Sequence, residues 1–167
     1  MYPSAYIHYL TEFHVERDYF ECHEILEEYW KKDPPQDRKR YWVGFIQLAV
    51  ALYHQRRNNF IGAKRLIANS LRILEEEKAA VESLGLDHKE LINLLKQTDQ
   101  KIAAHSPYES IMLPLTDQAL IKACQKQGKS KSGQQNDFLT HKHRLRDRTE
   151  VLQAREKAKM LRKKSRD

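Results

Sequence analysis

The chain has 167 residues, of which 40% are hydrophobic and 32% charged, a length and composition that suit one compact domain. Its two cysteines, Cys22 and Cys124, lie far apart, which excludes a disulfide framework or a cysteine-based zinc site and suits a reducing compartment. Because no apolar run approaches the roughly 20 residues that span a bilayer and no signal peptide is visible, we expect a cytoplasmic protein without a membrane partner.

The net charge of +7 is distributed unevenly along the chain. Residues 122–167 contain 15 lysines and arginines against 5 acidic residues, a balance of +10, whereas residues 1–121 contain 15 against 18, a balance of −3. The basic character therefore belongs to the C-terminal tail and not to the rest of the chain.

Two helices are predicted at the N-terminus. Residues 4–15 indicate a short helix. Asp18 and Glu21 then have the spacing of a capping box, which predicts a helix over 19–32 that stops before Pro34-Pro35. A single continuous helix that joins the two segments is the alternative, and the residues do not decide between them.

The middle of the chain predicts a helical hairpin. Helices over 37–57 and 60–84 are separated only by Asn58-Asn59, so they should lie antiparallel, and Gly85 is a natural stop for the second. A capping box formed by Asp87 and Glu90 predicts a further helix to about residue 104.

The C-terminal third changes character. Over residues 108–115 apolar positions alternate around Pro114, which predicts an extended strap lying on the helices and not a sheet, since no partner strand exists. Thr116-Asp117 should cap a short helix to about residue 126. The predicted fold is all-α: a helical core domain over 1–126 with its strap, a flexible linker over 127–137, and a separate basic helical tail over 138–167.

Polar residues interrupt the apolar face of the predicted 19–32 helix. On a helical wheel, an arc of about 120° contains Phe20, His23, Glu27 and Trp30 together with Tyr19 and Leu26. We expect this face to be buried, with His23 and Glu27 in its middle. A buried carboxylate costs several kcal/mol in desolvation unless it is paired or binds a metal.

The next predicted helix repeats the pattern. Gln47 and His54 share a face with Arg40, within an otherwise apolar run. If this helix packs on the first, its polar groups meet His23 and Glu27 in one polar cluster, a common arrangement for metal or small-ligand sites in helical bundles.

Three segments follow a pattern shared with a known family: the stretch from Arg17 to Trp30, Gly44-Phe-Ile-Gln-Leu-Ala-Val-Ala-Leu-Tyr-His, and Asn59-Phe-Ile-Gly-Ala. Over about residues 13–75 the chain resembles a bacterial and archaeal family known as domain of unknown function 309. The family's His-x-x-x-Glu-x-x-(Trp/Tyr) motif matches His23, Glu27 and Trp30. The resemblance implies a small all-helical fold and a motif suggested to bind metal, but no established activity.

Three interpretations of His23 and Glu27 remain open. They form a structural polar pair, in which Glu27 accepts from His23 or Arg40 and Gln47 completes the network. They bind a divalent metal ion, with His54 as the third ligand that a catalytic zinc site usually needs. Or they bind a small ligand or move a proton, with the pKa of Glu27 raised by burial. Trp30 fits core packing better than a stacking role.

Two functional hypotheses follow. The first is a metal- or small-ligand-binding protein, a possible hydrolase, with the residues His23, Glu27, Trp30, Gln47, His54 and Arg40. The second is a non-enzymatic interaction protein whose basic tail, residues 138–167, binds a nucleic acid or an acidic protein. Under either hypothesis we expect a homo-oligomer, because helical bundles with an apolar face often dimerise.

Overall fold

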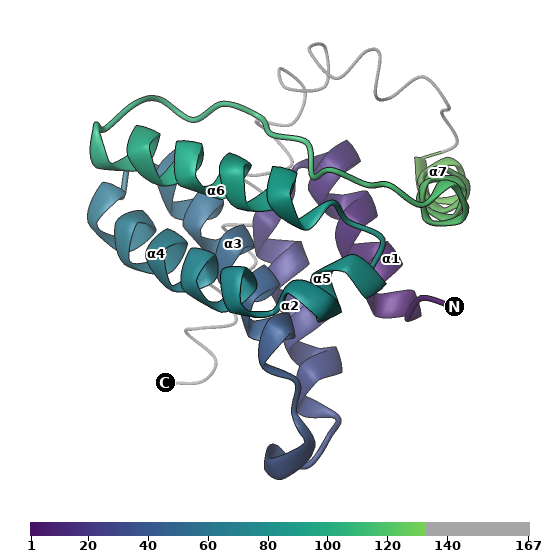
Figure 1. The fold of residues 1–167 in the computed structure, drawn as a ribbon. Helices are drawn as coiled ribbons and strands as arrows, with labels where there is room; N and C mark the ends of the chain where they lie inside the picture. The colour runs from purple at the N-terminus through teal and green to yellow at the C-terminus, as the bar shows by residue number, and fades with distance from the viewer. Residues whose placement is uncertain (133–167) are drawn as a thin grey trace, which may run out of the picture.

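Helix α3 (Arg40–Arg56) lies at the centre of the bundle, with α2 (Tyr19–Lys31) packed along one side and α4 (Phe60–Glu76) along the other (Figure 1). Helix α6 (His88–Ala103) packs on α4, α1 (Ser4–Thr11) packs on α2, and α7 (Gln118–Ser132) packs on α1. The computed structural model describes residues 1–132, and over these the predicted all-α bundle is confirmed. The helical elements of this part of the chain are α1 (Ser4–Thr11), η1 (Glu12–Glu16), α2 (Tyr19–Lys31), η2 (Pro35–Asp37), α3 (Arg40–Arg56), α4 (Phe60–Glu76), α5 (Lys78–Ser83), α6 (His88–Ala103) and α7 (Gln118–Ser132).

The predicted hairpin of α3 and α4 forms, and Gly44 lets the two helices approach closely. A Cβ atom at Gly44 would lie 2.7 Å from Leu74 Cδ2 and 3.1 Å from Ile73 Cγ2, so no larger side chain fits without displacing α4. The Ser70 hydroxyl donates to the Gly44 carbonyl oxygen at 2.8 Å across the same contact. The buried Ser70 hydroxyl is thereby satisfied inside an otherwise apolar interface.

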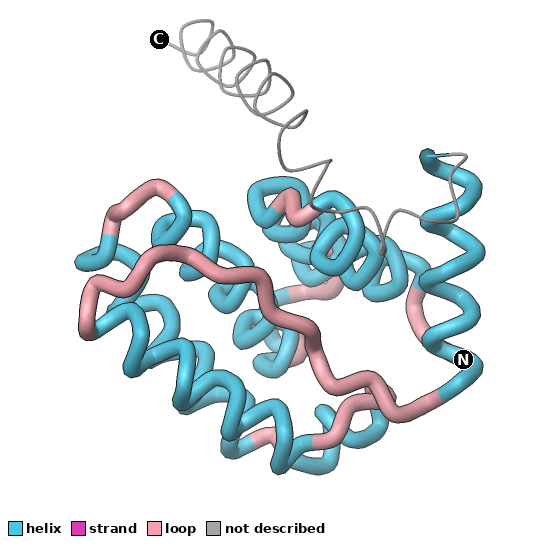
Figure 2. The backbone as a smooth tube through the Cα atoms, turned by 90° about the horizontal axis from the view of Figure 1, so that it is seen from above, coloured by secondary structure: helices cyan, strands magenta, loops and turns pink. Residues whose placement is uncertain are grey.

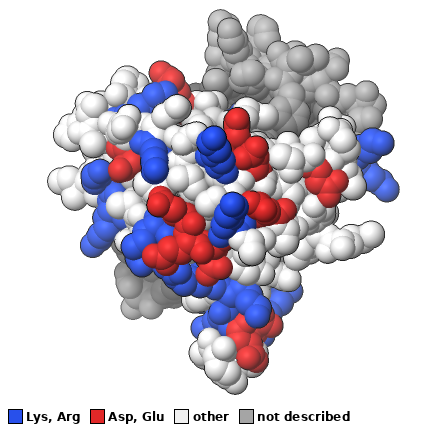
Figure 3. Space-filling view, viewed as in Figure 1, with Lys and Arg blue, Asp and Glu red and all other residues white. Residues whose placement is uncertain are grey.

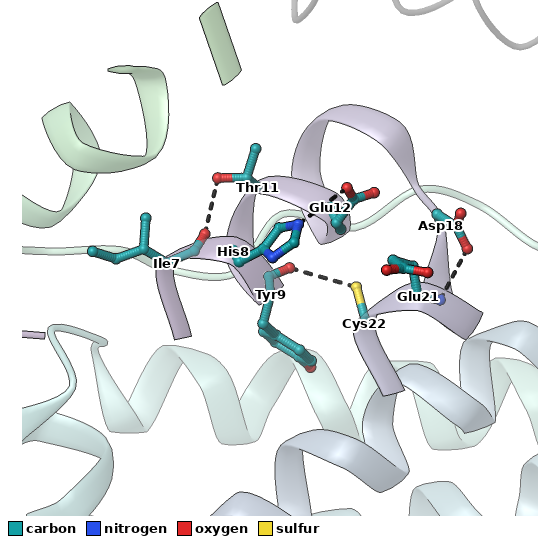
Figure 4. A network of polar contacts seen from close by, with 8 residues as sticks. All are labelled: Ile7, His8, Tyr9, Thr11, Glu12, Asp18, Glu21 and Cys22. Atoms are coloured by element: carbon teal, nitrogen blue, oxygen red, sulfur yellow. Dashed lines mark hydrogen bonds and ion pairs between the residues drawn. The ribbon is translucent and has the colours of Figure 1, made fainter. Parts of the chain in front are cut away.

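The N-terminal segment is two helices and not one. After α1 the backbone widens into the short π-helix η1, and Arg17 then adopts a left-handed conformation (φ 55°) that ends it. Asp18 accepts a hydrogen bond from the Glu21 N–H at 3.0 Å, which confirms the predicted cap of α2. Figure 4 shows this junction, where the Cys22 thiol of α2 also donates to the Tyr9 carbonyl of α1 at 3.4 Å.

The prediction of one helix over 60–84 is wrong. Helix α4 ends at Glu76, and Glu77 (φ −103°, ψ 46°) separates it from the short helix α5. The turn lets Val81, on α5, reach the core with no exposed surface. Gly85 stops α5 with φ 79°, as predicted, and Asp87 caps α6 by accepting from the Glu90 N–H at 3.0 Å.

The predicted strap is present as an irregular segment between α6 and α7 that runs across the bundle (Figure 2). Its far end pairs with the α5–α6 turn through an isolated antiparallel bridge between Leu86 and Leu115. The Thr116 N–H donates to the Gly85 carbonyl at 2.8 Å, and the Asp87 N–H donates to the Pro114 carbonyl at 3.0 Å. Backbone hydrogen bonds therefore fix this end without a sheet.

Buried side chains of His14, in η1, and of Arg17, which directly follows η1, hold the middle of the strap. The Leu113 N–H donates to His14 Nε2 at 3.0 Å, and the Arg17 guanidinium donates to the Ile111 carbonyl. The Arg56 guanidinium of α3 in turn donates to the Arg17 carbonyl at 2.7 Å. Burial, followed by the charge of Arg17, lowers the pKa of His14 to about 3, so this imidazole is neutral and can accept the bond. No part of this anchoring was predicted.

Helix α7 is longer than predicted. Asp117 caps it as expected, accepting from the Ala119 N–H at 2.9 Å, but the helix continues through Gly128 to Ser132 and so runs into the predicted linker. The rest of that linker and the predicted basic tail over 138–167 lie outside the described residues. Within the described residues, no helix has the length and apolar character needed to cross a membrane.

Candidate functional site

His23 and Glu27 form a direct pair on the outer face of α2. His23 Nε2 lies 2.7 Å from Glu27 Oε2, and Lys31 Nζ lies 2.9 Å from the other carboxylate oxygen. The hydrogen bond from Lys31 is the main cause that holds the pKa of Glu27 below its ordinary value, and His23 adds to it. The carboxylate is therefore ionised at neutral pH. The prediction that burial raises the pKa of Glu27, as an acid/base site would need, is therefore wrong.

The expectation that His23 and Glu27 lie in the middle of a buried face is also wrong. Their side chains are 27% and 32% exposed, whereas Tyr19, Cys22 and Leu26 are fully buried. The buried stripe is rotated because α1 and α3 both pack on α2 and together cover its Cys22 side. The pair consequently lies at the rim of the bundle, where a ligand can reach it.

Aromatic contacts at both ends fix the alignment of α2 with α3. The Phe20 ring lies 5.9 Å from the Tyr53 ring, and the Tyr29 ring lies 5.6 Å from the Trp42 ring. The two helices are thus antiparallel. The His23–Glu27 pair on α2 and residue 47 on α3 both fall between these two ring contacts.

Two buried polar atoms near the pair lack hydrogen-bond partners among the described residues. They are the indole nitrogen of Trp30 and the amide oxygen of Gln47. Trp30 is half-buried against the core, with the Arg38 guanidinium 4.9 Å from its ring centroid. The first atom is a donor and the second an acceptor, and leaving such groups unsatisfied costs about 1–3 kcal/mol each. Native proteins keep few of them, often at functional sites.

Arg40 does not join the site, contrary to the sequence hypothesis. Its Nη1 atom lies 2.7 Å from Glu76 and 3.9 Å from Glu77. Because α3 begins where the antiparallel α4 ends, Arg40 meets the acidic end of α4 and not Glu27. Figure 3 shows acidic side chains gathered where α4 gives way to α5.

His54 lies on α3 at the other end of the face. Its Nδ1 atom is 3.2 Å from Asn59 Nδ2, across the turn into α4, and its ring lies 5.7 Å from the ring of Tyr53. Among the described residues, no three His, Cys, Asp or Glu side chains come close enough together to hold a metal ion. The predicted set of His23, Glu27 and His54 is therefore not assembled in this conformation.

Phe20 and Tyr53 are the ring residues whose joint role sequence reasoning missed. Phe20 was placed on the correct arc of the helix, but nothing indicated that Tyr53 faces it from α3. The Phe20 ring also lies 5.9 Å from the imidazole of His23. The sequence offered one signal for the position of Tyr53. This residue directly precedes His54 and follows Val50 by one helical turn, which places it on the same outer side of α3 as Val50.

These features describe a small helical protein with a His-x-x-x-Glu-x-x-Trp motif on the face shared by two antiparallel helices. The model of the family described as Domain of unknown function (DUF309) matches residues 6–66, which include most of α1, all of α2 and α3, and every predicted site residue. The chain belongs to this family.

A full-length relative supports this assignment. The chain is similar to the uncharacterized protein YpuF of Bacillus subtilis (strain 168), with 60% identity over 174 residues and 100% of each chain covered. No solved structure matches the chain. Neither the family description nor the name of the relative assigns an activity, so any function must be argued from the site.

Proposed function

We propose that the face shared by α2 and α3 binds a small polar ligand, with the His23–Glu27 pair at its centre. The observation that supports this most is the buried donor of Trp30 and the buried acceptor of Gln47, neither hydrogen-bonded to a described residue. A ligand that offers the complementary acceptor and donor would satisfy both atoms and recover their desolvation cost.

The pair also has the composition needed to move a proton. Glu27 is an ionised acceptor at neutral pH, and His23, bonded to it, has the side chain used most often for general acid–base catalysis. In a hydrolase of this design, Glu27 would orient His23 and stabilise its imidazolium form, and His23 would activate a water molecule. Lys31 would hold the carboxylate in position.

A divalent metal ion is the weaker version of the same proposal. His23 and Glu27 supply two ligands, and a third would have to come from a rearranged side chain such as His54. The direct 2.7 Å contact between His23 and Glu27 would also have to open to admit an ion between them. Hydrogen bonding to an organic ligand needs neither change.

The test is a nuclear magnetic resonance screen of polar fragments on the full-length protein, with metal analysis of protein purified without chelator. We expect fragments to shift the resonances of Trp30 and Gln47. Binding should fall at least tenfold in His23→Ala and Glu27→Gln, because these lose the central polar contacts. Glu28→Gln, on the exposed side of the same helix, is the matched control and should bind normally.

Circular dichroism must show that all three variants stay folded. Fragments that never perturb this face, or that bind equally to the parent and to both site variants, would refute the proposal. Near-stoichiometric metal that is lost in both folded site variants would replace the hydrogen-bonding version with the metal version.

The charge distribution favours a second candidate function, an interaction made by the basic tail. Residues 138–167 carry 11 lysines and arginines against 4 acidic residues. We propose an electrostatic contact with a nucleic acid or an acidic protein, which releases counterions and weakens steeply with salt.

A full-length variant with Arg162, Lys163, Lys164 and Arg166 changed to Gln should bind labelled duplex RNA or polyglutamate at least tenfold more weakly at 50 mM salt. Unchanged affinity would exclude the tail as the contact.

A further inference from the structure

We propose that the ligand of the α2–α3 face is a nucleotide, that is, an aromatic heterocycle joined to a phosphate, either free or within a single strand. This inference rests on the proposed function, because it names the ligand class of the same site. Three features support it: partly exposed rings along the face, arginines stacked on rings at both ends, and hydrogen-bonding groups between them.

The rings form an interrupted row along the face. Phe20 lies 5.9 Å from His23 and 5.9 Å from Tyr53, with interplanar angles of 52° and 49°. Trp30 lies ten residues beyond Phe20 on α2, about 15 Å away at the rise of an α-helix. None of these four side chains is fully buried. Partly exposed aromatic faces are the surfaces on which nucleobases stack, whatever the base.

An arginine is stacked at each end of this row. The Arg57 guanidinium lies 5.2 Å from the Tyr53 ring centroid and donates to the Tyr53 hydroxyl. The Arg38 guanidinium lies 4.9 Å from the Trp30 ring centroid and donates to the Asp33 carbonyl at 3.0 Å. Guanidinium groups held this way bring a planar fork of N–H donors, which matches the geometry of phosphate, next to a stacking surface.

The local charge is complementary to an anion. The α2–α3 hairpin projects from the bundle (Figure 1), and its connecting segment, residues 32–39, contains three lysines and arginines against two aspartates. Lys31 and Arg40, at the helix ends beside it, are already paired with Glu27 and Glu76. All of these charged residues are exposed except Arg38, which is half-buried on Trp30. A phosphate near the tip would therefore meet an excess of positive charge, whereas a cationic ligand would be repelled.

Hydrogen-bonding groups between the two ends suit the edge of a base. The buried Trp30 indole N–H is a donor and the buried Gln47 amide oxygen is an acceptor, and the Glu27 carboxylate adds a second acceptor. Nucleobase edges carry donors and acceptors side by side, so they can satisfy both kinds of group at once. A fully deprotonated inorganic anion such as sulfate cannot donate to Gln47, and an apolar ligand can neither donate to it nor accept from Trp30.

The experiment follows the two tryptophan indole signals of the full-length protein by nuclear magnetic resonance, assigned with Trp30→Phe. Adenosine monophosphate, adenosine and ribose 5-phosphate are titrated in parallel at 20 mM and 300 mM salt. We expect adenosine monophosphate to shift the Trp30 signal and to bind at least tenfold more tightly than either fragment. Its affinity should fall with salt, because the phosphate contact is electrostatic.

The arginine arm uses Arg38→Gln and Arg57→Gln, with Arg65→Gln on the exposed side of α4 as the matched control. We expect Arg38→Gln to weaken adenosine monophosphate several-fold while adenosine binding is unchanged, and the control to behave as the parent. Arg57 lies at the other end of the row, too far away for the same phosphate, so Arg57→Gln should weaken only a longer, strand-like ligand. A six-residue oligoadenylate that binds more than tenfold tighter than the mononucleotide identifies a strand as the source of the ligand. Equal affinity identifies free nucleotides.

Two results would overturn the inference. If adenosine binds as tightly as its monophosphate, the site does not recognise the phosphate and the nucleotide inference fails. The proposed small-ligand site at His23 and Glu27 would still stand. No response of Trp30 to any of these probes would exclude nucleotides, and the fragment screen would then decide the proposed function by itself.

Discussion

Lowering the pH from 7 to 4.5 is expected to reduce the free energy of unfolding by about 2–3 kcal/mol through His14 alone. The folded protein keeps this imidazole neutral, because burial and the neighbouring Arg17 charge lower its pKa to about 3 from the ordinary 6.5. The unfolded chain takes up a proton below pH 6.5 and the folded protein does not. Stability is therefore lost as the pH falls through the window from 6.5 to 3, by about 4–5 kcal/mol over the whole window.

Urea denaturation at both pH values measures this loss of unfolding free energy. The variant His14→Gln separates the contribution of His14 from that of the acidic side chains. The glutamine amide oxygen can accept the Leu113 N–H, as His14 Nε2 does at 3.0 Å, but it does not titrate. We expect the variant to lose about 2–3 kcal/mol less than the parent between pH 7 and pH 4.5. An identical loss in the two proteins would show that His14 is not held neutral by burial.

Replacing Tyr9 with alanine is expected to destabilise the protein by about 3–5 kcal/mol, the usual cost of deleting a buried aromatic ring. Tyr9 is fully buried on α1 and packs against Phe13 and Phe45 at ring distances of 5.8 Å and 6.2 Å. Its hydroxyl donates to the Phe45 carbonyl of α3 at 2.8 Å. The substitution leaves a cavity between α1 and α3 and also removes the partner of that carbonyl.

Tyr9→Phe separates these two contributions. It keeps the ring and removes only the hydroxyl, so we expect a loss of about 1 kcal/mol. Urea denaturation at pH 7 measures both variants. A loss as large for phenylalanine as for alanine would mean that the hydrogen bond to α3, and not the packing of the ring, holds α1 in place.

The site and the strap use histidine in opposite ways. His23 is partly exposed and paired with an ionised carboxylate, so its imidazole is accessible to a ligand and to solvent. His14 is buried and neutral and accepts a backbone N–H, so its role is structural. Their residue type alone gave no means of telling them apart, because the distinction lies in burial and in partners that are remote in sequence.

Local signals in the sequence were sufficient for most helix boundaries. Asp18 and Asp87 both cap their helices as predicted by accepting the N–H three residues further on, and Gly85 ends α5 with a positive φ. The reciprocal half of each predicted capping box is replaced, because the Asp18 and Asp87 N–H groups donate to Glu12 and Pro114 carbonyls. The two caps and the Gly85 stop depend on contacts within a few residues of the chain, so a single sequence specifies them. The alternation around Pro114 likewise predicted an extended segment correctly, because proline excludes the helix locally.

Only the tertiary structure decided which side of α2 is buried and which residues share the site. The wheel placed His23 and Glu27 on the apolar arc, but α1 and α3 cover the side that carries Cys22 and leave the pair at the rim. The same packing directs Arg40 to Glu76. The sequence by itself determined the helices, their caps and the residues capable of chemistry. Their burial and pairing depend on helix packing between distant segments, which no local pattern encodes.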